Sequence, residues 1–115
     1  MSVTRIVAQS SPFVLAKQLE ANILRLLAHI DSADLSTKEQ HTLAQLKNSL
    51  IDARLEIQDY ELAETRDDQL RNAKIAKKYL QNVEKMMAVN PTGVFGPVDV
   101  AHLTAYIGQI TDKLR

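Results

Sequence analysis

The sequence predicts an all-α protein, folded as an antiparallel four-helix bundle or as an elongated helical hairpin bundle. First, the chain contains neither Pro nor Gly between Pro12 and Pro91. Second, good helix formers are abundant, with 13 Ala, 15 Leu and 8 Gln among 115 residues. Third, apolar residues recur at steps of three and four, the period of a helix that buries one face. We expect helices over about residues 12–30, 37–64, 66–89 and 98–114.

The first expected helix begins at Ser11-Pro12. A Ser side chain at the N-cap accepts a hydrogen bond from a free amide of the first turn, and a Pro at the next position loses no bond there. The expected core stripe is Ala16, Leu19, Ile23, Leu26 and Ile30. Three further leucines widen the apolar face beyond this stripe, so the helix should contact more than one neighbour; they are Leu15, Leu24 and Leu27.

The second expected helix opens at Ser36, with Glu39 three positions later. This spacing predicts a capping box, in which the two side chains satisfy each other's backbone amides. Six apolar positions then follow at strict spacings of three and four, which is typical of helices that pack nearly parallel. They are Leu43, Leu46, Leu50, Ala53, Ile57 and Tyr60.

Residues 37–89 form either one long helix or two helices with a break near 64–67. The apolar stripe changes to another side of the helix after Tyr60, and Thr65 to Asp68 matches a second capping box. Two features favour one continuous helix instead. A break would put Glu61 at a helix C-terminus, where a carboxylate is unfavourable, and a lateral row of leucines could bridge a continuous helix. We expect the break, because folding back would set the acidic segment 52–68 against the basic segment 71–85.

The last expected helix follows a loop over residues 90–97 that is rich in Pro and Gly. Gly108 lies inside this helix, and we expect it to permit close approach of a neighbouring helix. Residues 1–11 are expected to be a flexible N-terminal arm, and residues 12–115 a single helical domain. The apolar stripe of the last expected helix is Val100, Leu103, Ile107, Ile110 and Leu114.

The composition excludes several classes of protein. Fourteen Lys and Arg balance 14 Asp and Glu, and there is no Cys. A disulfide scaffold, a cysteine-based zinc site and a strongly basic nucleic-acid binder are therefore excluded. The start of the chain does not resemble a secretory signal, and no stretch is apolar enough for a membrane span, so we expect a cytoplasmic protein. No catalytic motif is present, and the nearest metal-ligand spacing, Asp99 with His102, is one isolated pair; we expect no enzyme activity, no metal and no cofactor.

The leading functional hypothesis is a small protein–protein interaction module, acting as an adaptor, a chaperone-like binder or an oligomeric assembly protein, with a dimer favoured. Its basis is apolar helix surface beyond what one small bundle needs to bury. The candidate partner-binding residues are Ile51, Leu55 and Leu62 on the second helix, together with Val94 and Phe95 in the loop. For the loop pair, the alternative is a plug over the end of the core.

The alternative function is a nucleic-acid-associated regulator. A row of bases lies along one side of the third helix, and such a row can follow phosphates. The neutral overall charge and the lack of aromatic residues beside the row make a nucleic-acid partner the less favoured of the two. The candidate anion-binding residues are Arg71, Lys74, Lys78 and Lys85.

Overall fold

The all-α class is confirmed by a computed structural model, which describes residues 11–89 and 93–115, without the side chain of Ser32. The predicted arm over residues 1–11 lies outside the described residues, apart from Ser11. Within the described part the chain forms four α-helices and one short 3-10 helix, and no strand. In chain order they are α2 (Pro12–Leu27), η1 (Ser32–Asp34), α3 (Thr37–Leu62), α4 (Arg66–Val89) and α5 (Pro97–Lys113).

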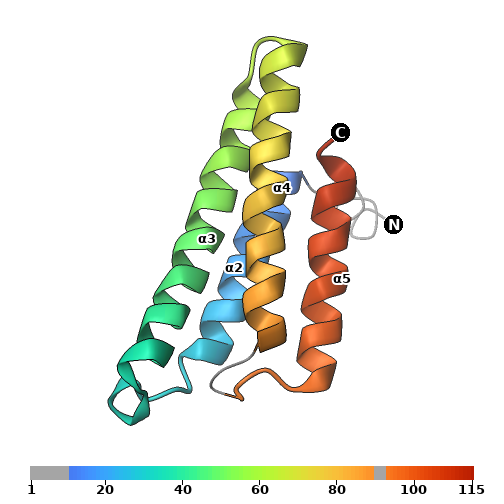
Figure 1. Ribbon diagram of the computed structural model, residues 1–115. Helices are drawn as coiled ribbons and strands as arrows, with labels where there is room; N and C mark the ends of the chain where they lie inside the picture. The colour runs from blue at the N-terminus through green and yellow to red at the C-terminus, as the bar shows by residue number, and fades with distance from the viewer. Residues whose placement is uncertain (1–10, 90–92) are drawn as a thin grey trace.

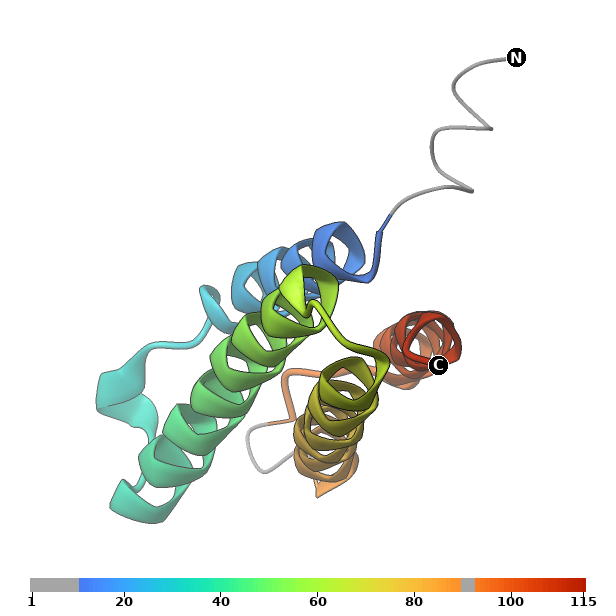
Figure 2. The ribbon, with the colours of Figure 1, turned by 90° about the horizontal axis from the view of Figure 1, so that it is seen from above.

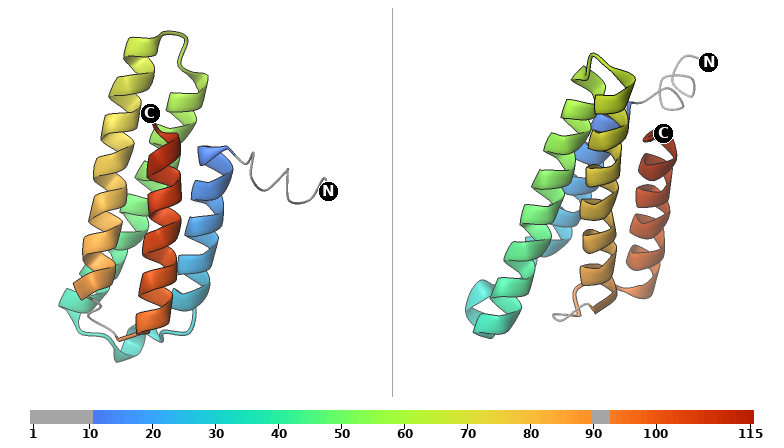
Figure 3. Two further views of the ribbon diagram at one scale, coloured as in Figure 1. Left: turned by 90° about the vertical axis from the view of Figure 1, so that its right-hand side faces the viewer. Right: turned by 45° about the horizontal axis from the view of Figure 1, so that its top comes forward.

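The four helices form a closed ring of antiparallel neighbours around one core (Figures 1 and 2). The most extensive packing joins α3 to α4; α2 lies beside α3, and α5 closes the ring against α2 and α4. The α3–α4 hairpin is longer than the other two helices and projects past them (Figure 3). The molecule is accordingly elongated, with extents of 46 × 35 × 18 Å.

The helix starts follow the capping chemistry of the sequence. Ser11 Oγ accepts a hydrogen bond of 3.2 Å from the Val14 amide. At α3 both arms of the predicted capping box form, because Ser36 Oγ accepts from the Glu39 amide at 3.1 Å and a Glu39 carboxylate oxygen accepts from the Ser36 amide at 3.0 Å. These bonds use donors that the first turn of a helix leaves without partners.

The predicted break between the second and third helices is confirmed. Ala63 leaves the helical region with a ψ of 134°, and α4 begins at Arg66. Thr65 Oγ1 accepts a 3.1 Å hydrogen bond from the Asp68 amide, which caps the new helix. The second arm of the expected box is replaced by an ion pair, since the Asp68 carboxylate binds Arg71.

Two helix ends differ slightly from the predicted boundaries. The first helix ends at Leu27 rather than near residue 30. The amides of His29 and Ile30 bond to carbonyls three residues back, so the chain tightens out of the α-helix there. The last helix begins at Pro97, one residue earlier than expected, and ends at Lys113.

The predicted apolar stripes form the core. Ala53 of α3 and Ala76 of α4 are both buried, and such small side chains leave room for two helices to pack closely. Four predicted stripe positions pack at the margin of the core and are partly buried: Leu26, Ile30, Tyr60 and Val100. The remaining predicted stripe positions of the first, second and last helices are buried: Ala16, Leu19, Ile23, Leu43, Leu46, Leu50, Ala53, Ile57, Leu103, Ile107, Ile110 and Leu114. On α4 the buried stripe is Ala73, Ala76, Leu80, Val83 and Met87.

Two expectations about packing are wrong. Within the two fully described helices α3 and α4, no ion pair joins one helix to the other, so charge pairing does not hold the hairpin together. The basic row of α4 lies about 120–180° around the helix from the buried Leu80, at about 100° per residue, and therefore faces away from α3. Gly108 makes no close approach either, since a Cβ added there would meet no atom within 4 Å.

Candidate interaction surfaces

The outer side of α3 carries the exposed apolar residues that the sequence predicted. Ile51, Leu55 and Leu62 are 37%, 47% and 70% exposed. They fall within an arc of about 40° on the side of the helix away from the core. Asp52 and Asp59 lie on the same side and are exposed. We call these five residues the acidic apolar face of α3.

The register between α2 and α3 places one further apolar residue beside this face. The Phe13 amide donates to Glu61 at 2.9 Å, and Glu20 pairs with Arg54 Nε at 2.8 Å. Seven residues forward along α2 thus match seven residues back along α3. The same register sets Leu24, which is also exposed, level with Leu50, the residue next to Ile51.

Of the three leucines that widen the apolar face of the first helix, two are covered inside the molecule. Leu15 and Leu27 are both buried in the core. The first helix contacts α3 on one side and α5 on the other, so its wide apolar face is covered inside the molecule. Of these three leucines, only Leu24 remains open to solvent.

The loop residue Phe95 is a correction to the predicted partner-binding set. Its side chain is 3% exposed and belongs to the core, so it closes the end of the bundle and is not an exposed anchor. Val94 is half-buried and packs against the same core. Gly93, directly before them, has a φ of +69°, a left-handed conformation that suits glycine.

The acids of α3 repel one another. Burial raises the pKa of Glu56, and the neighbouring carboxylates of Asp59 and Asp52 raise it further. No basic side chain is paired with these three acids among the described residues. The outer side of α3 is therefore an uncompensated region of negative charge.

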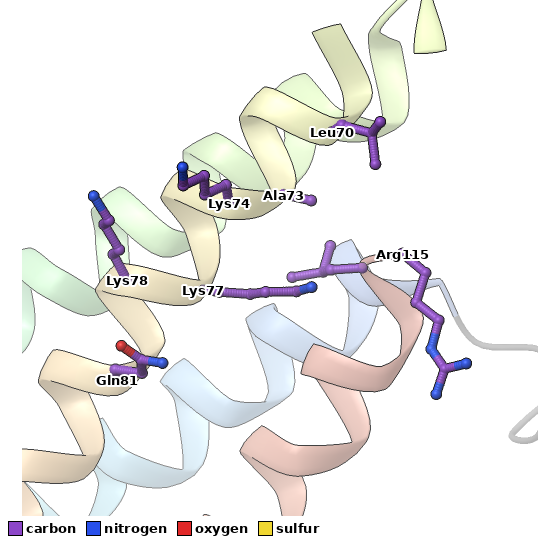
Figure 4. Close-up of a pocket in the computed structure, with 8 residues that line it drawn as sticks. Leu70, Ala73, Lys74, Lys77, Lys78, Gln81 and Arg115 are labelled. Carbon is purple, nitrogen blue, oxygen red and sulfur yellow. The ribbon is translucent and has the colours of Figure 1, made fainter. Parts of the chain in front are cut away.

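The basic row on α4 is only partly gathered into one place. Arg71 is held by Asp68, and Lys85 lies outside the groove described next. Lys74 and Lys78 line a shallow groove of about 350 Å³ between α4 and the end of α5 (Figure 4). We call it the basic groove; its lining is Leu70, Ala73, Lys74, Lys77, Lys78, Gln81, Leu114 and Arg115.

Two cations of this groove, Lys77 and Arg115, lie outside the basic row predicted from the sequence. Lys77 extends from α4 toward the end of α5, and Arg115 stands across from it on the other side (Figure 4). Lys77 lies off the exposed row, on the flank toward α5, and the contribution of Arg115 needs the long-range contact between α4 and α5. The end of α5 is also tied to α3, because the Tyr60 hydroxyl lies within hydrogen-bond distance of the carbonyl oxygens of Lys113 (3.3 Å) and Arg115 (3.2 Å).

A second, smaller depression of about 210 Å³ lies between α2 and α5. It contains Asp99 and His102, the pair with metal-ligand spacing, together with Arg25. Among the described residues no group of three or more His, Cys, Asp or Glu side chains could hold a metal ion.

Comparison of the chain with known protein families, curated proteins and solved structures finds no match. In the described part of the chain, none of the helices is both long and apolar enough to cross a lipid bilayer.

Proposed function

We propose that this chain is a non-catalytic protein–protein interaction module of the cytosol, and that α3 provides its main contact surface. The observation that carries the proposal is the acidic apolar face, where Ile51, Leu55 and Leu62 stay exposed although the bundle already has a complete core. Exposed apolar residues at helical spacing fit the helix-in-groove mode of recognition. The absence of Cys fits a reducing compartment.

The core explains why these side chains can be assigned to a partner. Every helix already buries its own stripe, and the ring of helices is closed. Leu55 and Leu62 therefore contribute no core packing in the single chain, and an exposed leucine that is covered on binding adds about 1.5–3 kcal/mol of favourable transfer free energy.

The experiment compares the wild-type chain with the variant L55Q/L62Q as bait in an extract of the native source. We expect at least one protein, or the chain itself, to be retained by the wild type and lost from the variant. V98Q is the matched control, because Val98 is an exposed apolar residue on α5 and lies outside the face. Identical sets of retained proteins for wild type and L55Q/L62Q would contradict the proposal, provided that circular dichroism gives the same helix content.

A second candidate, binding of nucleic acid, is favoured by one observation: Lys74, Lys78 and Lys85 are exposed and no acid of the described chain pairs with them. Fluorescence anisotropy with a labelled single-stranded oligonucleotide tests it. Binding that weakens steeply between low and moderate salt, and that is reduced in K74Q/K78Q, would support this function. A flat titration at low salt would exclude it for that oligonucleotide.

A further inference from the structure

The charges of this chain are balanced in number but separated in space. The acids of the acidic apolar face lie on the outer side of α3, and the bases of the basic groove lie between α4 and α5. No acid lines the basic groove, and the acids of the acidic apolar face have no ion-pair partner among the described residues. The two surfaces are on different sides of the molecule, so they cannot neutralise each other within one chain.

We propose that the basic groove of one copy takes the acidic apolar face of α3 from a second copy of this chain. The inference rests on the proposed function, and it names the partner. Head-to-tail association of identical copies requires two complementary surfaces on each chain, and this chain carries both.

The two surfaces match in length. The acidic apolar face runs from Ile51 to Leu62, and the α4 side of the groove runs from Leu70 to Gln81. Each spans 11 residue steps, or about 16 Å at about 1.5 Å per residue. The acidic apolar face of one copy can therefore lie along the α4 side of the groove of another copy over about three turns of helix.

The two surfaces also match in chemistry. Leu70 is 47% exposed and gives the groove apolar surface, against which the leucines of α3 can pack. Ala73 and Leu114 lie buried beneath it. Lys74, Lys77 and Arg115 stand around that surface and can pair with the carboxylates of a second copy. Burial raises the pKa of Glu56, and repulsion from Asp59 and Asp52 raises it further; these cations would relieve the repulsion.

A contact of this kind joins two different surfaces, so each copy keeps one surface free after the first contact. Association should therefore continue beyond a dimer, unless the rotation between copies closes a ring. The charged pairs at such a contact favour fast association and weaken as salt rises.

The test uses two variants that each disable one surface. K74E/K77E reverses charge in the groove and leaves α3 intact, whereas D52K/D59K reverses charge on α3 and leaves the groove intact. We expect the wild type to form concentration-dependent oligomers in sedimentation velocity at low salt and each variant alone to be monomeric. An equimolar mixture of the two variants should associate again, because the intact acidic face of K74E/K77E fits the intact basic groove of D52K/D59K, and the two reversed surfaces are also opposite in charge.

K38E/K47E is the matched control for K74E/K77E: it makes the same change in net charge at two exposed lysines of α3 outside both surfaces, and it should associate as the wild type does. Circular dichroism of each variant establishes that the helices are retained. A wild type that stays monomeric up to millimolar concentration would overturn the inference, and so would a mixture that stays monomeric. Either outcome leaves the capture experiment with L55Q/L62Q to decide the proposed function separately, since a different partner could still use the face.

Discussion

At the scale of single residues, Gly108 is a position where the chain gives up stability without a packing benefit. It lies inside α5, it is exposed, and a methyl group at its Cα would meet no neighbour. We expect G108A to stabilise the fold by about 1 kcal/mol, because Ala restricts the unfolded chain and favours the helix. Thermal unfolding should show a rise in Tm of about 4 °C. A lower Tm would mean that α5 needs the flexibility of glycine.

Glu56 makes stability depend on pH in a direction opposite to most carboxylates. Its pKa is raised above 4.5 by burial and by Asp59 and Asp52, so the folded chain binds this proton more readily than the unfolded chain does. The group therefore lowers stability at neutral pH, and this penalty disappears as the pH falls through the raised pKa toward about 4.5. We expect E56Q to be more stable than wild type at pH 7 and about equal to it at pH 4. Urea unfolding at both pH values measures the difference; an equal gain at both would contradict this origin.

At the scale of elements, the short loop before α5 holds the end of the bundle closed through Phe95. The phenyl ring of Phe95 is buried in the core, and no other residue of the described loop is as deeply buried. We expect F95A to cost about 3–5 kcal/mol, the usual range for removing a buried aromatic ring. Urea unfolding provides the measurement, and V94A, at the half-buried neighbour, should cost less. Equal losses for the two variants would indicate that the whole loop, and not the ring, closes the core.

The elements themselves followed from local chemistry that the sequence displays. Ser11, Ser36 and Thr65 cap helices as expected, and the change of apolar face after Tyr60 predicted the α3–α4 turn. The fate of Phe95 and Leu27 could not be decided from spacing, because their burial depends on which neighbours the tertiary fold supplies. The basic groove was only half predicted for the same reason, since Arg115 reaches it from a different helix.

At the scale of the whole molecule, the ring of contacts predicts an uneven distribution of stability. The α3–α4 pair makes the most extensive contact, whereas α5 touches two helices more lightly. In native-state hydrogen exchange we expect the slowest amides at the centre of α3 and α4, near Ala53 and Ala76, and faster exchange in α5 through local opening. Uniform protection across all four helices would instead indicate a single cooperative unit with no weaker element.

The projecting end of the α3–α4 hairpin also has a practical consequence. The turn over residues 63–65 stands clear of α2 and α5 (Figure 3), and the chain contains no cysteine of its own. A single thiol introduced at Glu64 would therefore be the sole attachment point for a fluorophore or a spin label, on a stiff arm about three turns of helix from the centre of the molecule. Distances measured from such a reporter would map how any bound molecule is oriented along the long axis.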